Sequence, residues 1–381
     1  WPDRIFNGRH PLKGANSERV TIPKPYETEL QTVIAALGDM KQSSVRWENA
    51  GTRNTGVLVS DTMMFQRADP KPSDTNLGSF HGLAMPLVKR GVPVEPVQIE
   101  SATAPGFLDR YKLLLLTYEG QKPPKPEFHA ALAKWVKAGG ALVVVDDDSD
   151  PYNAVREWWN TAPNSFKTPR QHLFKQLGLP EDATGLHKVG RGVVVRETLS
   201  PAALTYREDG AETVRKSVRQ AAAAVKLAWS ETDSLVLRRG PYVIAAGLDE
   251  STPGAKTFVL HGRHLNLFDP ELGILTDVTI TPASRMLLLD LSSVKPSDFR
   301  VVAAACRVRD EKIDGKTLQF HADGIGNTNS VAQIAAPSAP AQVLVGGEPL
   351  DATKYDFSGG MLRLRFPNSV EPQTVEVRLA K

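Results

Sequence analysis

The side chains of this sequence that could do chemistry follow three apolar runs in its first half. They are Asp61 after residues 56–60, Tyr118 and Glu119 after residues 111–117, and the acidic run from Asp146 to Asp150 after residues 141–145. The carboxyl ends of parallel strands meet at one edge of a sheet, and ligands of open parallel sheets bind there. We therefore expect these side chains to lie on a common rim, where they could bind the hydroxyl groups of a ligand.

The acidic run could also hold a metal ion. Asp146, Asp148 and Asp150 alternate along the chain, and carboxylate oxygens are the ligands that Ca²⁺ and Mg²⁺ prefer. The run lacks the glycine and the distal glutamate of a full calcium loop. The favoured alternative is that Asp147 to Asp150 cap a helix starting near Pro151, where carboxylates suit free N–H groups. We therefore expect the chain to hold no cofactor, with Ca²⁺ as the alternative.

Aromatic residues lie directly after the acidic run and could stack on a sugar ring. They are Tyr152, Trp158 and Trp159. Two adjacent tryptophans on a helix cannot face the same way, so we expect at least one to be in the core. The predicted carbohydrate-binding set is Asp61, Tyr118, Glu119, Asp147, Tyr152 and Trp158.

No complete catalytic site is evident in the sequence. The eight histidines are scattered without the spacing of a zinc site, and no base or orienting residue accompanies Ser60 or Thr62. A carboxylate pair such as Asp61 and Glu119 could do general acid–base work if the two stood at glycosidase separation. That hydrolase remains an alternative, but the main expectation assigns no catalytic residue to this chain.

The elements that must position the rim alternate between strands and helices. Residues 1–54 are predicted to form an extended lead-in and an amphipathic helix with Leu30, Val33, Ile34, Leu37 and Met40 on its apolar face. From residue 55 to 232, short apolar strands alternate with helical patterns over residues 79–89, 127–138 and 211–229. This rhythm predicts an α/β domain with an open, doubly wound, mostly parallel sheet. The run 111–117 contains four consecutive leucines, Leu113 to Leu116, which is typical of a strand buried on both faces.

Residues 233–381 are predicted to be β-rich and to end in a β-sandwich. Apolar runs recur there every 8 to 12 residues or so with turn residues between them. The expected strands include residues 242–247, 257–260, 285–291, 299–308, 317–320, 342–345, 361–366 and 374–379.

Composition excludes several classes of protein. The 46 basic and 43 acidic residues are interspersed, so the sequence has no basic stripe for nucleic acid. No run approaches the length of a membrane span. The single cysteine, Cys306, lies in an apolar run and is predicted to be a buried thiol. The sequence starts with neither Met nor a signal peptide, as a cut or excised segment would; the compartment is undetermined, with a periplasmic or secreted location favoured.

Residues 55–230 resemble the class I glutamine-amidotransferase-like (flavodoxin-like) fold, in the version that follows the catalytic barrel of family 42 β-galactosidases. The motifs that carry the likeness are Gly56-Val57-Leu58-Val59-Ser60-Asp61, Gly139-Gly140-Ala141-Leu142-Val143-Val144, Gly190-Arg191-Gly192-Val193-Val194-Val195 and Ser200-Pro201. The segment from Gly262 to Pro270 is similar to the β-domains that close such enzymes. The region departs from true amidotransferases because it has no cysteine, no Gly-x-Cys-x-Gly elbow and no His-x-Glu, which excludes thioester chemistry.

The resemblance implies a non-catalytic, carboxyl-terminal portion of a glycoside hydrolase that serves packing, oligomerisation and active-site lining. Its partners would be a catalytic barrel domain, upstream or on another chain, a carbohydrate, and further copies of itself in a homo-oligomer. The alternatives are a stand-alone carbohydrate-binding or scaffold protein and a hydrolase that uses rim carboxylates.

Overall fold

The computed structural model divides the chain into two compact units. It describes residues 12–13, 19–20, 22–40, 45–64, 71, 77–248 and 254–380. Unit 2 comprises Asn49–Leu235 and Leu248–Lys256, and unit 1 comprises Trp1–Glu48, Val236–Gly247 and Thr257–Lys381. Most of unit 2 is therefore one continuous segment inserted between two segments of unit 1. Among the described residues, no helix is long and apolar enough to cross a membrane.

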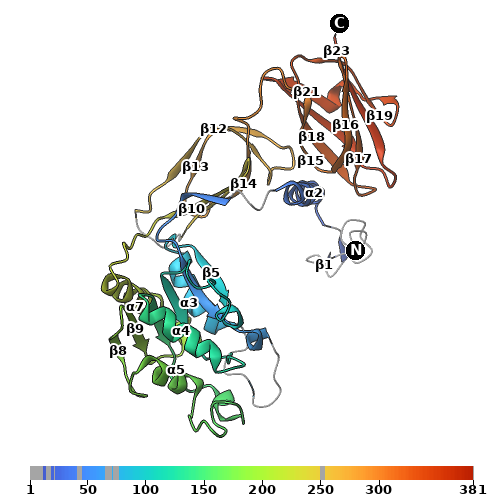
Figure 1. Cartoon of the computed structure of the whole chain (residues 1–381). Coiled ribbons are helices and arrows are strands. Elements are labelled where there is room, and N and C mark those ends of the chain that lie inside the picture. The colour runs from blue at the N-terminus through green and yellow to red at the C-terminus, as the bar shows by residue number, and fades with distance from the viewer. Residues whose placement is uncertain are drawn as a thin grey trace. The chain divides into compact units, whose positions relative to one another are not determined.

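Unit 2 is built around a six-stranded sheet (Figure 1). Its strands in spatial order are β5 (Val94–Gln98), β4 (Thr55–Val59), β6 (Leu113–Leu116), β7 (Ala141–Val145), β9 (Gly192–Glu197) and β8 (Gly185–Val189). The first five are parallel, and β8 pairs antiparallel with β9. The strand order reverses direction between β4 and β6.

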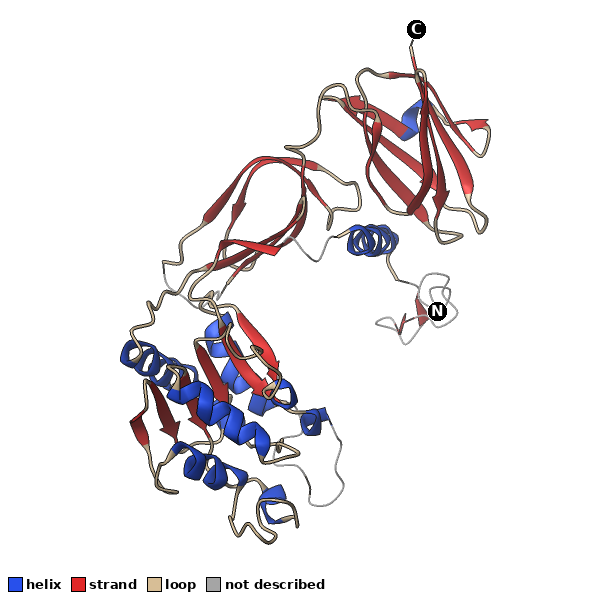
Figure 2. Cartoon of the chain, in the orientation of Figure 1, coloured by secondary structure: helices blue, strands red, loops and turns tan. Residues whose placement is uncertain are grey.

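Helices cover both faces of this sheet (Figure 2). They are α3 (Gly78–Val88), α4 (Glu127–Lys137), α5 (Pro169–Leu177), α6 (Pro201–Leu204) and α7 (Gly210–Ala224), with 3-10 turns at Asp61–Met64, Ile99–Ser101 and Pro151–Ala154. Leu114 and Leu116 pack in one core with α4 and α5, while Leu113 and Leu115 pack in the other with α3 and α7. All four leucines are at most 1% exposed, so β6 is buried on both faces, as predicted.

The helix predicted over residues 211–229 is shorter in the structure. α7 ends at Ala224, and Lys226 follows with a positive φ of 57°. A residue in the left-handed region ends a helix because it turns the chain away from the helical path.

Unit 1 has a six-stranded sheet and a β-sandwich. The sheet has the order β13 (Ile274–Ile280), β12 (Phe258–Asn266), β14 (Arg285–Asp290), β11 (Tyr242–Gly247), β10 (Ser234–Arg239) and β3 (Val45–Asn49). Within it, β11, β14, β12 and β13 pair antiparallel. Its edge strand β3 comes from the segment before unit 2, and the neighbouring β10 from the segment after it. The short strands β1 (Leu12–Lys13) and β2 (Arg19–Val20) pair with each other.

The sandwich stacks a four-stranded sheet on a five-stranded one around a single apolar core. The first sheet contains β15 (Arg300–Ala304), β18 (Asn329–Ala335), β22 (Met361–Pro367) and β21 (Tyr355–Ser358). The second contains β16 (Arg307–Asp314), β17 (Thr317–Asp323), β23 (Gln373–Leu379), β19 (Pro340–Val345) and β20 (Glu348–Pro349), and a 3-10 turn spans Ala352–Lys354.

The single strand predicted over residues 299–308 is wrong. The chain crosses from one sheet of the sandwich to the other at Ala305 and Cys306, so the apolar run supplies the end of β15 and the start of β16. The Cys306 thiol is buried, as predicted, and burial raises its pKa to about 11.

The helix predicted before unit 2 forms, but only part of its predicted apolar face is buried: Met40 lies in the core and Val33 packs against it. α2 spans Lys24–Asp39, and its buried residues are Glu27, Thr28, Gln31, Thr32 and Ala36. Ile34 and Leu37, which lie on the same predicted apolar face, are 55% and 56% exposed. The polar residues are buried because the sandwich meets them with polar partners: the Gln31 side chain donates to Thr328 Oγ1 at 3.0 Å and accepts from Asn368 Nδ2 at 3.1 Å.

Candidate functional site

The predicted rim lies at the carboxyl ends of β4, β6 and β7 in unit 2. Sheets of this kind bind ligands where the strand order reverses, here between β4 and β6. The rim segments that follow these strands begin at Ser60, Thr117 and Asp146. This is the place to look for a ligand site.

The crevice between β4 and β6 is filled by the loop after β6. The Gln121 Nε2 group donates to the Leu58 and Thr117 carbonyls at 3.0 and 2.9 Å, and its Oε1 accepts from Ser60 N at 2.6 Å. A cavity of about 10 Å³ remains beside it. That volume holds about one water molecule, so a sugar ring does not fit there without movement of the loop.

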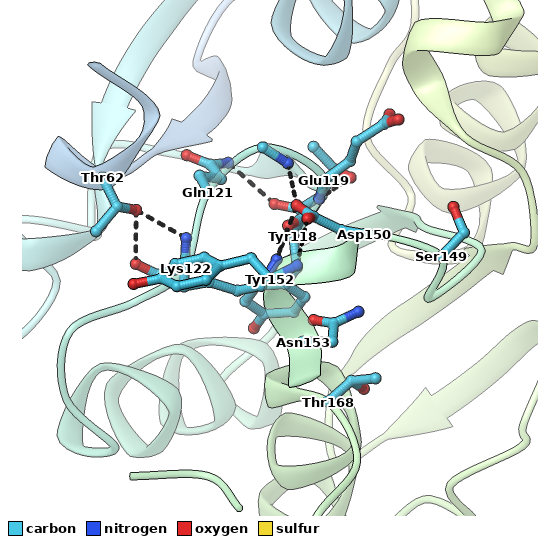
Figure 3. A network of polar contacts seen from close by, with 12 residues as sticks. Thr62, Tyr118, Glu119, Gln121, Lys122, Ser149, Asp150, Tyr152, Asn153 and Thr168 are labelled. Atoms are coloured by element: carbon cyan, nitrogen blue, oxygen red, sulfur yellow. Dashed lines mark hydrogen bonds and ion pairs between the residues drawn. The ribbon is translucent and has the colours of Figure 1, made fainter. Parts of the chain in front are cut away.

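The same loop carries a buried ion pair, which Figure 3 shows from close by. Lys122 is 1% exposed, and its Nζ donates to Asp150 Oδ2 at 3.0 Å. The Lys122 backbone also bonds to the Thr62 hydroxyl, through N at 2.8 Å and through O at 2.9 Å. Lys122 thereby links the segment after β4 to the segment after β7.

Asp150 is fixed by donors from three sides. Besides Lys122, the Gly120 and Tyr152 N–H groups donate to it at 2.5 and 2.9 Å. Burial acts to raise the pKa of Asp150, but the Lys122 ammonium and these N–H groups outweigh it and hold the pKa below its ordinary value. Its bond from Tyr152 N caps the 3-10 turn Pro151–Ala154, which confirms the capping alternative for this residue.

The other two candidate metal ligands are engaged elsewhere. Asp146 is buried and accepts from the N–H groups of Tyr118 and Asp148 at 2.6 and 2.7 Å. Burial, and then the Asp148 charge, raise its pKa. Asp148 accepts from Arg170 Nη2 at 2.6 Å and Arg196 Nη2 at 3.1 Å. Within the described ranges, no group of three or more His, Cys, Asp or Glu residues is arranged to hold a metal ion.

The three carboxylates of the predicted carbohydrate-binding set lie in different parts of the rim. Glu119 is 5% exposed and accepts from Ser200 Oγ at 2.7 Å and Ala202 N at 3.0 Å, which ties it to the start of α6. Asp61 is exposed and accepts from Gln98 Nε2 at 2.7 Å. Asp147 is exposed and accepts from Ser149 N at 3.0 Å. Of the three, Asp61 and Asp147 face solvent and Glu119 is built into the fold.

The predicted aromatic platform is part of a packed cluster. Trp159 is 1% exposed, and its neighbour Trp158, half-buried, crosses it nearly at right angles and donates to the Pro123 carbonyl at 2.8 Å. The pair lies in a turn and not in the expected helix, but one member is core, as predicted. Tyr152 is half-buried and contacts Trp159 edge to face.

A buried chain of polar aromatic groups lies behind the rim, and the sequence reasoning missed it. The Tyr118 hydroxyl is 2.7 Å from His129 Nε2, and His129 Nδ1 is 2.8 Å from His172 Nδ1. Burial and the neighbouring His172 hold the pKa of His129 well below its ordinary value, and burial, then Lys175, lower that of His172.

One signal in the sequence could have found this chain. His129 lies on the apolar face of α4 with Phe128, Leu132 and Val136, and a histidine at such a position needs a buried partner. Its partner His172 comes from α5, 43 residues away, so no local spacing joins them.

Comparisons with known proteins leave the family open. The sequence matches no protein-family model and no curated protein. Three similar solved structures bear the names of glycosidases. A rhamnosidase from Novosphingobium sp. PP1Y is 11% identical with a TM-score of 0.29, over 88% of this chain and 35% of that chain. A GH31 dextranase from Flavobacterium johnsoniae is 12% identical with a TM-score of 0.21, over 67% and 38%.

The third, alpha-L-fucosidase isoenzyme 2 from Paenibacillus thiaminolyticus, is 11% identical with a TM-score of 0.26, over 92% and 51%. The chain therefore spans about half or less of the length of these three. TM-scores this low do not establish a common fold, so the likeness assigns neither a family nor a site.

Proposed function

We propose that this chain is a non-catalytic portion of a glycoside hydrolase, in which it packs on a catalytic barrel domain, supports a homo-oligomer and lines the active site. The observation that carries the non-catalytic part is the sealed crevice of unit 2. Gln121 and Lys122 occupy the position where a sheet of this type binds its ligand, and both are 3% exposed or less.

The charge pattern of the rim supports the same assignment. A retaining or inverting glycosidase needs two carboxylic groups that flank one open space. Here Glu119, Asp146 and Asp150 are buried and saturated by N–H, hydroxyl and ammonium donors. Groups fixed in this way hold loops together and are not free to exchange protons with a substrate.

The link to carbohydrate rests on the sequence resemblance to the amidotransferase-like domain of family 42 β-galactosidases. The order of the five parallel strands of unit 2, with a reversal between β4 and β6, is compatible with that domain. In this assignment Asp61, Asp147 and half-buried Tyr152 and Trp158 are the rim residues left to face a neighbouring sugar. A periplasmic or secreted location goes with this proposal.

The first experiment is an activity assay of the 381-residue chain on a panel of aryl glycosides. We expect no turnover. Turnover that Asp147→Ala abolishes would contradict the proposal, because Asp147 is exposed and its loss leaves the buried network intact. The coding sequence upstream of Trp1 gives a second check, since the proposal expects a (β/α)₈ pattern with two strand-end glutamates there or on a partner chain.

A stand-alone carbohydrate-binding protein is the second candidate, and a groove in unit 1 favours it. The groove has a volume of about 360 Å³ and is lined by Lys24, Pro25, Glu271, Asn329, Lys354 and Phe366, among others. The ammonium, carboxylate and amide groups of Lys24, Glu271 and Asn329 suit the hydroxyl groups of a sugar. Calorimetry against a panel of oligosaccharides separates the two candidates, because only the second requires the isolated chain to bind one.

A further inference from the structure

The helix α2 presents apolar side chains to solvent in one continuous row. We call this row the outer stripe: Tyr26, Leu30, Ile34 and Leu37, at intervals of one helical turn. Tyr26, Ile34 and Leu37 are 48%, 55% and 56% exposed, and Leu30 is half-buried. A helix on the surface of a globular protein normally turns this face inward.

The opposite face of α2 is already occupied by its own unit. Thr28 Oγ1 donates to the Asn329 carbonyl at 3.4 Å, and Gln31 bonds to Thr328 and Asn368 on the sandwich. These bonds satisfy polar groups that are at most 5% exposed, so rotating the helix to bury the outer stripe would leave them unpaired. The orientation of α2 is therefore fixed by its inner face.

The sequence of α2 is that of a helix covered on both sides. From Leu30 to Gly38 it carries no charged residue. Exposed helix faces of soluble proteins are rich in charge, and large apolar patches on a surface mark interaction sites. The outer stripe thus has the composition of an interface.

We propose that the outer stripe packs against the same stripe of a second copy of this chain, with the two helices antiparallel about a two-fold axis. The stripe is symmetric in the way such a pair requires. Its ends, Tyr26 and Leu37, and its middle residues, Leu30 and Ile34, are centred near residue 32, so Tyr26 meets Leu37 of the copy and Leu30 lies close to Ile34.

The charges at the ends of α2 favour this partner. Lys24 opens the helix, where its Nζ lies 3.0 Å from Oε2 of buried Glu27, and Asp39 closes the helix, where a negative charge is unfavourable for the helix dipole. In the antiparallel pair, Lys24 of one copy lies beside Asp39 and the carbonyl end of the other, so both charges become favourable. Within its own copy, Lys24 pairs with Glu27 and donates to Asn327 O, and Asp39 accepts from the Tyr242 hydroxyl. The Lys24 side chain is nevertheless 57% exposed and Asp39 is exposed, so a second copy can reach both charges.

The expected dimer is a weak one. A stripe of four side chains supplies less than the roughly 800 Å² per partner of a standard stable interface. We therefore expect dissociation on dilution, and the proposal is tested by sedimentation velocity of the whole chain over a wide concentration series.

The first variant places a charge in the stripe. Ile34→Glu should raise the dimer dissociation constant at least tenfold, because each copy would then bury a carboxylate against the apolar Leu30 of the other. The matched control is Ile313→Glu, since Ile313 on β16 is 56% exposed and lies outside the stripe. It should sediment as the unmodified chain does.

The second test exchanges the end charges. Lys24→Glu alone should weaken the dimer, because the new carboxylate would lie beside Asp39 of the other copy. Lys24→Glu combined with Asp39→Lys should restore the dimer, because opposite charges then lie beside each other again. Circular dichroism of each variant checks that α2 remains folded. A helix that binds a different domain through the stripe has no reason to show this rescue.

The inference rests on the oligomerisation part of the proposed function. Different experiments test the pairing of α2 and the non-catalytic role of the chain, so either can be refuted without the other. A chain that is monomeric at every concentration, or a dimer that Ile34→Glu leaves intact, overturns the two-fold pairing of α2. Neither result bears on whether the chain is catalytic, which the glycoside assay decides.

Discussion

The polar groups of the rim in unit 2 are arranged to bind one another. Lys122 with Asp150, Asp148 with Arg170, and Glu119 with Ser200 each join segments that follow different elements. An ammonium that is 1% exposed is costly unless it is paired, so the rim loops are held together by the need to keep these pairs intact.

Removing one member of the buried ion pair should therefore be more damaging than removing both. Lys122→Met leaves Asp150 buried without its cation and should lower the free energy of unfolding of unit 2 by about 3 to 5 kcal/mol. Lys122→Met with Asp150→Asn should be less destabilised than the single variant. Urea denaturation measures both, with exposed Lys125→Met on the same loop as the control. Equal stability of Lys122→Met and Lys125→Met would refute a structural role for the pair.

The Tyr118–His129–His172 chain should make unit 2 sensitive to acid. The pKa values of both histidines are lowered in the folded state, so at mildly acidic pH the folded protein binds fewer protons than the unfolded chain does. Their contribution to stability is complete above the unfolded pKa of about 6.5 and is lost as the pH falls below it. We expect the free energy of unfolding to fall by up to about 1.4 kcal/mol per pH unit for each histidine.

Denaturation curves from neutral to mildly acidic pH test this dependence. His172→Phe should reduce the slope because one titrating group is removed, while His261→Gln, at an 83% exposed position, should leave it unchanged. A slope that both variants share with the unmodified chain would place the acid sensitivity elsewhere.

At this scale the sequence predicts where the candidate residues lie but not what they bind. The position of each candidate residue at the end of a strand can be predicted, because the apolar run that forms the strand is a pattern of neighbouring residues. The partners of the candidate residues are set by loop geometry, such as the positive φ of 62° that turns Asp148 toward Arg170, and by helices far along the chain. No spacing in the sequence encodes those contacts.

Among the elements, those with the most complete burial were the most predictable. The inner parallel strands β4, β6 and β7 are continuous apolar runs because both their faces are covered, and the structure has them at the expected positions. β18 was not predicted: its sequence, Asn-Ser-Val-Ala-Gln-Ile-Ala, mixes polar and apolar residues without a period, although nearly all of it is buried. The helical period located α2 correctly but could not say which face its surroundings would cover.

Gly192 and Gly38 should respond differently to substitution by alanine, because only Gly192 lies in close contact with a neighbouring element. A Cβ on Gly192, at the start of β9, would lie 2.1 Å from the Val136 carbonyl oxygen of α4, whereas one on Gly38 of α2 meets nothing within 4 Å. Gly192→Ala should destabilise unit 2 by about 1 to 3 kcal/mol through overpacking. Gly38→Ala should stabilise its helix by up to about 1 kcal/mol. Thermal unfolding compares the two, and a tolerated Gly192→Ala would mean that β9 and α4 can separate.

For the whole molecule, the division into two units predicts independent folding of the inserted one. Unit 2 has cores on both faces of its sheet, and its ends meet where the Asn49 side chain donates to Ser234 Oγ at 2.7 Å. A polypeptide of residues 49–235 should fold and unfold cooperatively, with a melting temperature within a few degrees of the corresponding transition in the whole chain. Calorimetry gives both values; a polypeptide with no transition would show that unit 2 depends on unit 1.

The neighbouring positions of β3 and β10 have a consequence for how the molecule is made. Glu48 on β3 bonds to Arg238 on β10, a residue synthesised 190 positions later. Until unit 2 has folded, the ends of that intervening stretch are far apart and closing the loop costs entropy. Once it has folded, the two strands emerge side by side, and a distant pairing becomes a local one. Folding of unit 2 therefore brings β3 and β10 together for the sheet of unit 1. Slow folding of unit 2 should delay the formation of that sheet.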